Sequence, residues 1–344
     1  MGLVDLIARV TEGHDLTIEE AESAFNEIMA GGVSSVHIAA LLVALRTKGH
    51  AASEVAGGVR ALRQNMVPVV APDGAELLDT CGTGGGAVTT FNISTAAALV
   101  AAAGGVRIAK HGNRSFSSRS GSADVLEALD VEIQMSPENM SVVLARAGIV
   151  FMFAPLLHPA MRHVGPVRKE LGIPTIMNLL GPLTNPAGAR RQVVGVADPT
   201  LLSLVAEALR ALDHDRALVV HGAPGMDEVS PSGITTIAEL RDGTVVEFDL
   251  DPEELGVPLF PTEALAGGTP EENARIIEEV LSGEERGGRR SAVVLNAAAA
   301  LYVGGVADDL RQGVVLAAEV IDSGAAVRTL DSLIRESRAA AGPG

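Results

Sequence analysis

The sequence is poor in aromatic side chains and in positive charge, and both shortages argue against nucleic-acid binding. Its 344 residues include no tryptophan and one tyrosine, and aromatic residues make up only 2%. Proteins that hold single-stranded nucleic acid stack the bases on aromatic side chains. The formal net charge is −17, whereas a protein that binds a phosphate backbone is expected to carry a basic surface. We therefore predict no nucleic-acid partner.

Cysteine and long apolar runs are scarce as well. Cys81 is the one cysteine, which excludes an internal disulfide and fits a reducing compartment. The first residues, MGLVDLIARV, lack the basic segment and the cleavage site of a signal peptide. No uninterrupted apolar stretch reaches the length that spans a membrane. We therefore expect a cytoplasmic protein with no membrane partner.

The hydrophobic pattern changes period after the first seventy residues. Residues 1–71 show helical spacing of apolar positions, and Thr17 and Glu20 form the pattern of a capping box. Prolines at 68 and 72 mark a linker. Beyond it, short strands alternate with helices; we expect strands at 76–80, 106–109, 131–133, 149–153, 192–196, 216–220, 234–240 and 244–248. This pattern predicts an α/β fold in which a small all-helical N-terminal domain precedes a large α/β domain. Its central sheet is mostly parallel and covered on both faces.

A proline-rich insert interrupts the alternation. Residues 155–186 contain six prolines and are too long for an ordinary connection between a strand and a helix. We infer that the insert returns to the helical part; the alternative is a surface lid. The predicted helical domain thus comprises residues 1–71 and 160–186, and the predicted α/β domain comprises residues 72–159 and 187–344.

The first stretch that indicates chemistry is DTCGTGGGAVTTFNISTAA, residues 79–97. It reads as a strand, a glycine loop and the start of a helix. Glycines let several backbone N–H groups approach one anion, and a helix start adds unpaired N–H groups. A plain βα turn needs one or two glycines, whereas four cluster here. The stretch matches neither a P-loop nor a dinucleotide fingerprint.

Two further loops follow predicted strands. KHGNRSFSSRSGSAD, residues 110–124, combines three cations with five serines, a composition that suits a polyphosphate. The alternative of a solvated basic loop fits poorly with a chain that is otherwise acidic. HGAPGMDEVS, residues 221–230, places Asp227 and Glu228 in a glycine- and proline-containing loop that suits Mg²⁺. Taken alone it reads as an acidic turn, but all three loops belong at the carboxyl edge of one parallel sheet.

Together with HPAMRHVGPVRKELGIPTIMNLLGPLTNP, residues 158–186, these stretches resemble the anthranilate phosphoribosyltransferase family over essentially the whole chain. The resemblance implies a small helical domain and a larger α/β domain with substrates at the hinge, and a homodimer joined through the helical domains. It also implies Mg²⁺-dependent transfer of the phosphoribosyl group of phosphoribosyl pyrophosphate (PRPP) to the amine of anthranilate. Pyrophosphate is released, and the reaction is a step of tryptophan biosynthesis.

The resemblance also implies roles for individual residues. Two Mg²⁺ ions per monomer would be held by Ser94, Asp227 and Glu228. Anthranilate would be contacted by Gly82, Asn113 and Arg168, with Arg168 suited to its carboxylate. No residue is assigned as an acid or base, because an aromatic amine is neutral at pH 7; His111 and Arg168 are candidates for positioning only. PRPP would be held by Gly82, Gly85, Gly86, Thr90, Asn92, Ile93, Ser94, Thr95, Lys110, His111, Gly112, Asn113, Arg114, Ser115, Phe116, Ser117, Ser118 and Ser122.

One position departs from the family pattern. The family usually reads GTGGDG where this chain has Gly86 and Ala87 in place of the Asp-Gly pair. Either a nearby group replaces that carboxylate or PRPP binds differently in detail. Among other reactive side chains, we expect His158 and His163 to form local hydrogen bonds and Cys81 to be a packed, inert thiol.

Two other functions are compatible with this architecture. A pyrimidine nucleoside phosphorylase would need no pyrophosphate site, and the pair Asp227–Glu228 and the loop from residue 110 to 114 argue against it. A relative that has lost catalysis and binds nucleic acid would need a basic surface, which the composition does not indicate.

Overall fold

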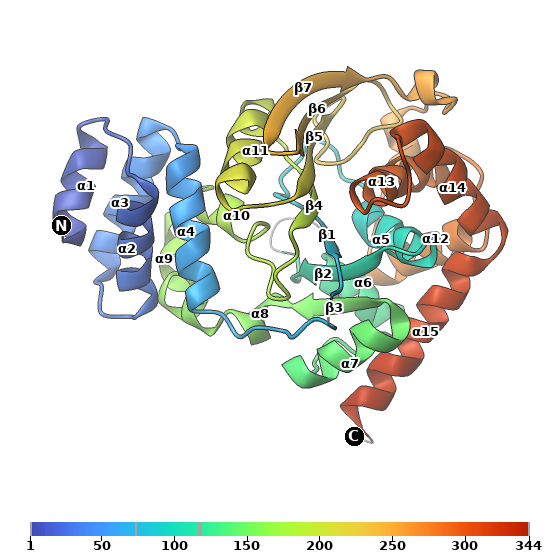
Figure 1. Ribbon diagram of the computed structural model, residues 1–344, viewed down its shortest axis with the longest axis horizontal. Helices are drawn as coiled ribbons and strands as arrows, with labels where there is room; N and C mark the ends of the chain where they lie inside the picture. The colour runs from blue at the N-terminus through green and yellow to red at the C-terminus, as the bar shows by residue number, and fades with distance from the viewer. Residues whose placement is uncertain (1, 73, 116–118, 343–344) are drawn as a thin grey trace.

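The computed structural model describes residues 2–72, 74–115 and 119–342, and it consists of a helical lobe beside an α/β body (Figure 1). The lobe begins with four helices: α1 (Leu3–Thr11), α2 (Ile18–Met29), α3 (Ser35–Lys48) and α4 (Ala52–Gln64). The predicted capping box is present, because the Thr17 hydroxyl accepts from the Glu20 N–H and the Glu20 carboxylate accepts from the Thr17 N–H. No helix in the described residues is both long enough and apolar enough to cross a bilayer.

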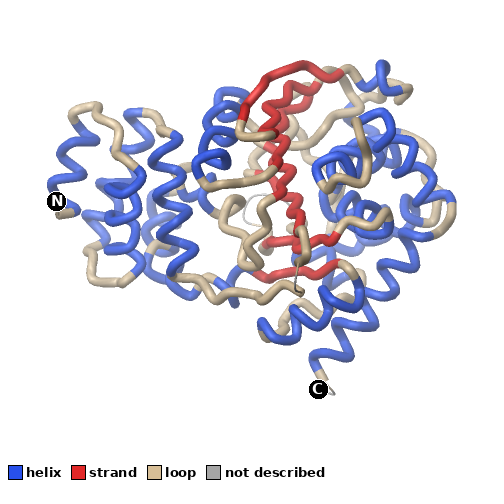
Figure 2. Tube along the Cα trace, in the orientation of Figure 1, coloured by secondary structure: helices blue, strands red, loops and turns tan. Residues whose placement is uncertain are grey.

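A seven-stranded sheet forms the centre of the body (Figure 2). Its strands are β1 (Leu77–Gly82), β2 (Arg107–Gly112), β3 (Ile149–Phe153), β4 (Arg191–Gly195), β5 (Arg216–Gly222), β6 (Thr235–Arg241) and β7 (Thr244–Leu250). Their spatial order is β3-β2-β1-β4-β5-β6-β7. The first five are parallel, and β6 and β7 are antiparallel. The predicted fold class is confirmed.

Helices cover both faces of the sheet. Successive side chains of a strand point to opposite faces, so neighbouring residues of one strand enter different cores. On β5, Leu218 and Val220 belong to the core that contains α5 (Ile93–Ala103) and α13 (Gly288–Val303). The alternate residues Ala217 and Val219 belong to the core that contains α11 (Leu202–Ala211) and the helical lobe. Side chains on both faces of β5 are therefore buried.

The remaining helices complete the α/β body and the connections. The short segments are α6 (Ser122–Ala128), α8 (Ala154–Leu157), η1 (Pro159–His163), α9 (Gly165–Leu171), α10 (Met177–Leu180), η2 (Pro199–Leu201), η3 (Pro252–Leu255) and η4 (Thr262–Leu265). The longer ones are α7 (Pro137–Ala147), α12 (Pro270–Leu281), α14 (Leu310–Asp322) and α15 (Ala325–Ala341). Most begin at a capping side chain or with a proline in the first turn; Ser136, for example, accepts from the Asn139 N–H at the start of α7.

The strand predicted at 131–133 is wrong. Val131, Ile133 and Met135 are buried at alternate positions, which imitates a strand in the sequence. The segment nevertheless pairs with no strand, and the Glu132 N–H donates to the Ser337 hydroxyl of α15. Its apolar side chains are buried against helices, so the alternation reflects burial without a β ladder.

The proline-rich insert returns to the helical lobe. Val164 and Met177 lie in the same buried core as Leu41 and Val59 of α3 and α4. Arg46 of α3 also donates to the carbonyl of Pro174. The insert then rejoins the body before β4, so the chain passes twice between the two parts. The exact domain boundaries given above stay a prediction.

Candidate functional site

Three loops meet at the carboxyl edge of the sheet. They follow β1, β2 and β5, and the parallel register brings the ends of β1, β4 and β5 together, with Gly82 beside Gly195 and Gly195 beside Val220. The Gly84 N–H donates to Asp227 Oδ2 at 2.9 Å, and the Ala87 N–H donates to the Gly225 carbonyl at 3.0 Å. The glycine loop and the acidic loop, 143 residues apart at that contact, are therefore one site.

Two glycines make this contact possible. A Cβ on Gly82 would lie 2.5 Å from Asp227 Oδ2, and one on Gly195 would lie 1.7 Å from the Asp227 carbonyl. A side chain at Gly82 would displace the Asp227 carboxylate, and one at Gly195 would displace the backbone of the acidic loop. Gly82 was identified from the glycine cluster. Gly195 was not, because a single glycine at the end of β4 has no signal in the sequence. Gly86 also faces Asp227: its Cβ would lie 3.4 Å from Oδ1.

The acidic pair is well suited to a hard cation. Glu228 is half-buried and its Oε1 accepts from the Ser94 N–H at the start of α5, at 3.2 Å. Burial, together with the neighbouring Asp227, raises the pKa of Glu228 to about 8. The described residues contain no cluster of three or more histidine, cysteine, aspartate or glutamate side chains that could hold a metal. Two carboxylates and the Ser94 hydroxyl fit an ion that takes its other ligands from water and phosphate, as Mg²⁺ does.

Lys110 lies beneath the glycine loop. This residue of β2 is 3% exposed, and its ammonium donates to the carbonyl and hydroxyl of Thr80 and, at 3.3 Å, to the Ser94 hydroxyl. Burial lowers its pKa, although Asp79 opposes this shift. The Lys110 ammonium is therefore held at the base of the site, next to Ser94 in the first turn of α5.

A buried carboxylate that was not predicted ties the strands to the hinge segment. Asp79 accepts from the His111 N–H at 3.1 Å and from the Asn185 side chain at 2.7 Å. The same Asn185 amide donates to the Ala109 carbonyl at 2.8 Å. Burial raises the pKa of Asp79 to about 6. Asp79 lies inside β1, just before the glycine loop, so an acid within an apolar strand was the available signal.

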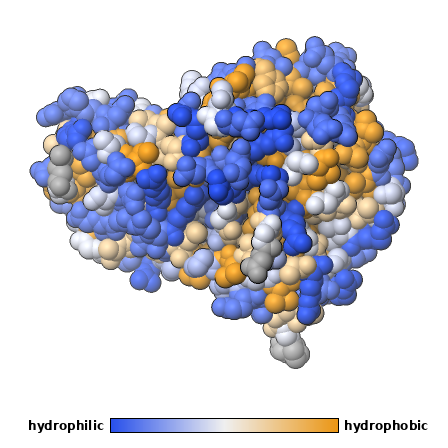
Figure 3. All heavy atoms as spheres, in the orientation of Figure 1, coloured by the Kyte–Doolittle hydropathy of each residue, from blue (hydrophilic) through white to orange (hydrophobic). Residues whose placement is uncertain are grey.

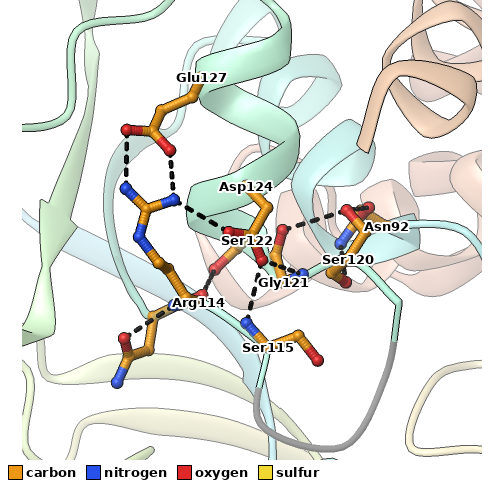
Figure 4. Close-up of polar contacts among 9 residues, drawn as sticks. Asn92, Arg114, Ser115, Ser120, Gly121, Ser122, Asp124 and Glu127 are labelled. Atoms are coloured by element: carbon orange, nitrogen blue, oxygen red, sulfur yellow. Dashed lines mark hydrogen bonds and ion pairs between the residues drawn. The ribbon is translucent and has the colours of Figure 1, made fainter. Parts of the chain in front are cut away.

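The loop after β2 is closed by Asp124 (Figure 4). Asp124 Oδ2 accepts from the Ser115 N–H at 3.0 Å and from the Gly121 N–H at 2.8 Å, so one carboxylate joins the two ends of the loop. Arg114 donates to Asp124 at 3.0 Å and to both oxygens of Glu127. These hydrogen bonds, those to Glu127 first, raise the pKa of Arg114. Arg114 was predicted to bind phosphate, but its guanidinium is occupied by two carboxylates.

Asn92 is also occupied. Its side chain contacts Ser120 through two hydrogen bonds of 3.2 Å and accepts from the Asn273 amide of α12 at 2.9 Å. Asn273 in turn accepts from the Gly268 N–H at 2.7 Å. Asn92 therefore links the glycine loop to the loop after β2 and to α12.

The other residues predicted for PRPP occupy three kinds of position. Gly85, Thr90, Ser94, Asn113, Ser115, Gly112 and Ser122 are exposed or half-buried in the loops or next to them. Ile93 and Thr95 are 1% and 2% exposed in the first turn of α5, so their side chains face the core. Phe116, Ser117 and Ser118 lie outside the described residues.

Two histidines from different parts of the chain meet near the end of β2. His111 and His158 are both buried, and their Nε2 atoms are 3.2 Å apart. Burial lowers the pKa of His111 to about 3 and that of His158 to about 4. Both rings are therefore neutral at pH 7. His163 lies 3.3 Å from Arg162 Nε, a local contact of the kind predicted. Cys81 donates to the Pro182 carbonyl at 3.4 Å, and burial raises its thiol pKa.

Arg168, on α9, has no counter-charge among the residues that the structure describes. It is half-buried, and burial alone lowers its pKa. Among the described residues its side chain has no hydrogen bond or ion pair. A cation in such a position is suited to an anion that comes from outside the chain. Polar residues gather along the middle of the face shown in Figure 3, between the helical lobe and the body.

Two family models match the two parts of the chain. Residues 4–66 match the helical bundle domain of a glycosyl transferase family, and residues 74–327 match the α/β domain of such a family. The anthranilate phosphoribosyltransferase of Rubrobacter xylanophilus is 52% identical over 342 residues, which are 99% of each chain.

Solved structures agree with the fold as a whole. The anthranilate phosphoribosyltransferase of Thermus thermophilus superposes with a TM-score of 0.92 at 47% identity, covering 97% of this chain and 99% of that one. The Saccharomyces cerevisiae enzyme in complex with PRPP and Mg superposes with a TM-score of 0.87 at 28% identity, covering 97% of both chains. The same yeast enzyme has a structure with 4-fluoroanthranilate, with a TM-score of 0.85, 28% identity and 98% of both chains covered.

Proposed function

This chain belongs to the anthranilate phosphoribosyltransferases, and from that premise we propose how its own residues transfer the phosphoribosyl group of PRPP to anthranilate. The observation that carries the proposal is the contact between the glycine loop and the acidic loop, through Gly84 and Asp227 and through Ser94 and Glu228. This contact puts backbone donors and carboxylates at one edge of the sheet, as a magnesium–diphosphate complex requires.

Asp227, Glu228 and Ser94 would hold magnesium, and we propose two ions per monomer. When bound, the metal neutralises the pyrophosphate and makes it a better leaving group. The backbone N–H groups of the glycine loop and the loop after β2 would bind the phosphates. Lys110, buried beneath both, would add positive charge without moving.

The proposal divides the predicted PRPP residues into two groups. Asn92 and Arg114 already have protein partners, so they would shape the loops rather than contact phosphate. Gly85, Gly86, Asn113 and Ser115 lie on the exposed or half-buried side and would face the ligand. Gly86 has no carboxylate to offer, and Asp227, which lies beside it, would serve that side of the pocket.

Anthranilate would be held by its carboxylate at Arg168, with Gly82 and Asn113 at the other side of the hinge. The amine of an aromatic acid is neutral at pH 7, so the chain needs no strong base to prepare it. The pair His111 and His158 is consistent with this, because pKa values of about 3 and about 4 make both rings weak bases. Positioning of the amine against the ribose then accounts for much of the rate, roughly 7–11 kcal/mol at most.

The carboxylates provide the test. We expect Asp227→Asn with Glu228→Gln to lower kcat/KM at saturating Mg²⁺ by at least about 100-fold, because several kcal/mol of charge stabilisation are lost. The assay is the decrease in anthranilate fluorescence with PRPP and Mg²⁺. Asp242→Asn, at a side chain 92% exposed in the turn between β6 and β7, is the control. An unchanged magnesium profile in the double variant would show that the ions bind elsewhere.

We also propose that the chain forms a homodimer through its helical lobe and works in the cytoplasm. Val4 of α1 and Val36 and Val43 of α3 are 60%, 72% and 37% exposed, although α3 is apolar on most of its faces. A helix of that composition is usually covered by another surface. Sedimentation should give a dimer for the natural chain and a monomer for Val36→Glu; a monomer in both would reject the proposal.

A further inference from the structure

Helix α13 contains one buried side-chain amide, that of Asn296, which has no part in the reaction proposed for the site. Asn296 lies within AVVLNAAAAL, residues 292–301, and the nine other residues of this stretch are all apolar. It is 3% exposed. A buried carboxamide costs free energy unless its donors and acceptor are all bonded. Its partners therefore show what the residue does.

Asn296 holds both backbone groups of one residue. Its Oδ1 accepts from the Val229 N–H at 2.9 Å, and its Nδ2 donates to the Val229 carbonyl at 2.8 Å. The second N–H of the amide donates to the Ala292 carbonyl of its own helix at 2.9 Å. The side chain thus pairs with Val229 as a neighbouring strand would, and α13 becomes the support of the acidic loop.

Val229 directly follows the two carboxylates assigned to magnesium. The Val229 side chain is itself 1% exposed in the core, so that residue is fixed by packing as well as by Asn296. On the other side, Glu228 is held by the Ser94 N–H. Asn296 and Glu228 also line one small cavity, together with Ser94 and Thr80.

We propose that Asn296 is a positioning residue for the divalent metal, acting by fixing the backbone from which Glu228 projects. The proposal rests on the assignment of Asp227 and Glu228 as metal ligands. Mg²⁺ demands near-octahedral geometry, so ligands on a loop must be held within a narrow range of positions. Groups that orient metal ligands typically contribute 10- to 100-fold to metal affinity.

A merely structural amide would behave differently. Such an amide would stabilise the fold and leave magnesium binding unchanged. We expect this behaviour of the Tyr302 hydroxyl, which is on the same helix. The Tyr302 hydroxyl donates to Glu239 at 2.6 Å and accepts from Arg241 at 3.2 Å, and both of these partners lie on β6. Tyr302→Phe is therefore the matched control, because it removes a polar contact of α13 away from the site.

The experiment measures PRPP binding by calorimetry at a series of Mg²⁺ concentrations, beside the melting temperature and the steady-state constants. In Asn296→Ala we expect the half-saturating Mg²⁺ concentration to rise about 10- to 100-fold. The KM for anthranilate should change less than about twofold, since the amide reaches only the metal loop. Tyr302→Phe should lower the melting temperature with no change in magnesium dependence. Asn296→Ser, which retains one hydroxyl, is measured in parallel in case the alanine variant does not fold.

The outcomes separate this inference from the proposed function. Suppose that every Asn296 variant that folds binds PRPP with the natural magnesium dependence, while Glu228→Gln does not. The positioning role of Asn296 is then overturned, and the assignment of the metal site stands. If Glu228→Gln also keeps the natural dependence, the metal assignment itself is wrong. If neither Asn296 variant folds, the residue is a structural anchor and the positioning role is rejected.

Discussion

The loop after β2 and the helix α9 each present an arginine predicted to bind a substrate anion, and the two differ in their partners. Arg114 donates to Asp124 and to both oxygens of Glu127, and it lies 5.5 Å from the centre of the Phe153 ring. Arg168 is half-buried with no acid beside it among the described residues. Arg114 was predicted to bind PRPP and Arg168 to bind the carboxylate of anthranilate. In the structure the guanidinium of Arg114 is paired with two carboxylates of the chain, whereas that of Arg168 has no such partner among the described residues.

Other polar groups of the site also differ in whether the chain itself supplies their hydrogen-bond partners. Asn92 is bonded to Ser120 and Asn273, so its amide is occupied. Glu228 accepts one backbone N–H, and its pKa is raised to about 8 because burial and Asp227 disfavour its charge. A group without sufficient partners gains most from a ligand, because the ligand removes a penalty already present in the folded chain.

Among the changes that test the difference between occupied and unoccupied groups, the largest effect is expected at Arg168. Arg168→Ala should raise the KM for anthranilate about 10- to 100-fold, since a charge-assisted hydrogen bond contributes about 1.5–3 kcal/mol. The KM for PRPP and the melting temperature should change little, because the guanidinium has no partner in the chain to lose. Lys169→Ala, which removes the adjacent exposed cation, is the control. Equal changes in both KM values would remove Arg168 from the anthranilate site.

The acid dependence of stability should be the next largest effect. His158 is neutral in the folded chain, its pKa being lowered from 6.5 to about 4 by burial, so the unfolded chain binds the proton first as the pH falls. Stability is therefore lost from pH 6.5 downwards, until about pH 4. Between pH 7.5 and 5.5 the natural chain should lose about 1.4 kcal/mol more than His158→Gln. Denaturant unfolding at both pH values measures this, with His37→Gln at an exposed position as the control. Equal losses in the natural chain and His158→Gln would show that His158 accepts a proton as readily folded as unfolded.

Removing the Asp124 carboxylate, which joins the two ends of the loop after β2, should have a smaller effect that is limited to the KM for PRPP. Asp124→Ala removes the carboxylate that accepts from the Ser115 and Gly121 N–H groups, and we expect the KM for PRPP to rise on the order of 10-fold. Glu127→Ala leaves both N–H groups bonded and should have a much weaker effect. Titration of PRPP at fixed anthranilate distinguishes the two. Similar KM values in both variants would show that the loop ends do not depend on Asp124.

The fold was predictable because its signals are local. Caps such as Thr17 with Glu20, the glycine clusters and the apolar strands depend on neighbours in the sequence, and the structure has them. The one wrong strand, 131–133, shows the limit of a local signal: burial at alternate positions does not require a paired neighbour.

The site was predictable only in part, because partners are chosen by tertiary packing. The three loops were identified from composition, since phosphate and magnesium need particular residue types. The bonds from Asn92 to Asn273 and from Val229 to Asn296 join residues 181 and 67 positions apart, and no spacing rule connects them. Whether a cation such as Arg114 is paired or free depends on such contacts. The composition of a motif therefore predicts where the chemistry lies more reliably than which side chains perform it.

The smallest effect is expected from the ion pair between Arg114 and Glu127. The Arg114 side chain is 46% exposed, so its pairing should contribute only about 0.2–1 kcal/mol to stability and should weaken at high salt. A double-mutant cycle with Arg114→Ala and Glu127→Ala, followed by denaturant unfolding at low and high salt, measures this coupling. The KM for PRPP should change by less than about threefold in Arg114→Ala, because the guanidinium is already occupied. A large increase in that KM with no coupling to Glu127 would make Arg114 a phosphate ligand after all, and the two arginines would then differ only in which substrate they bind.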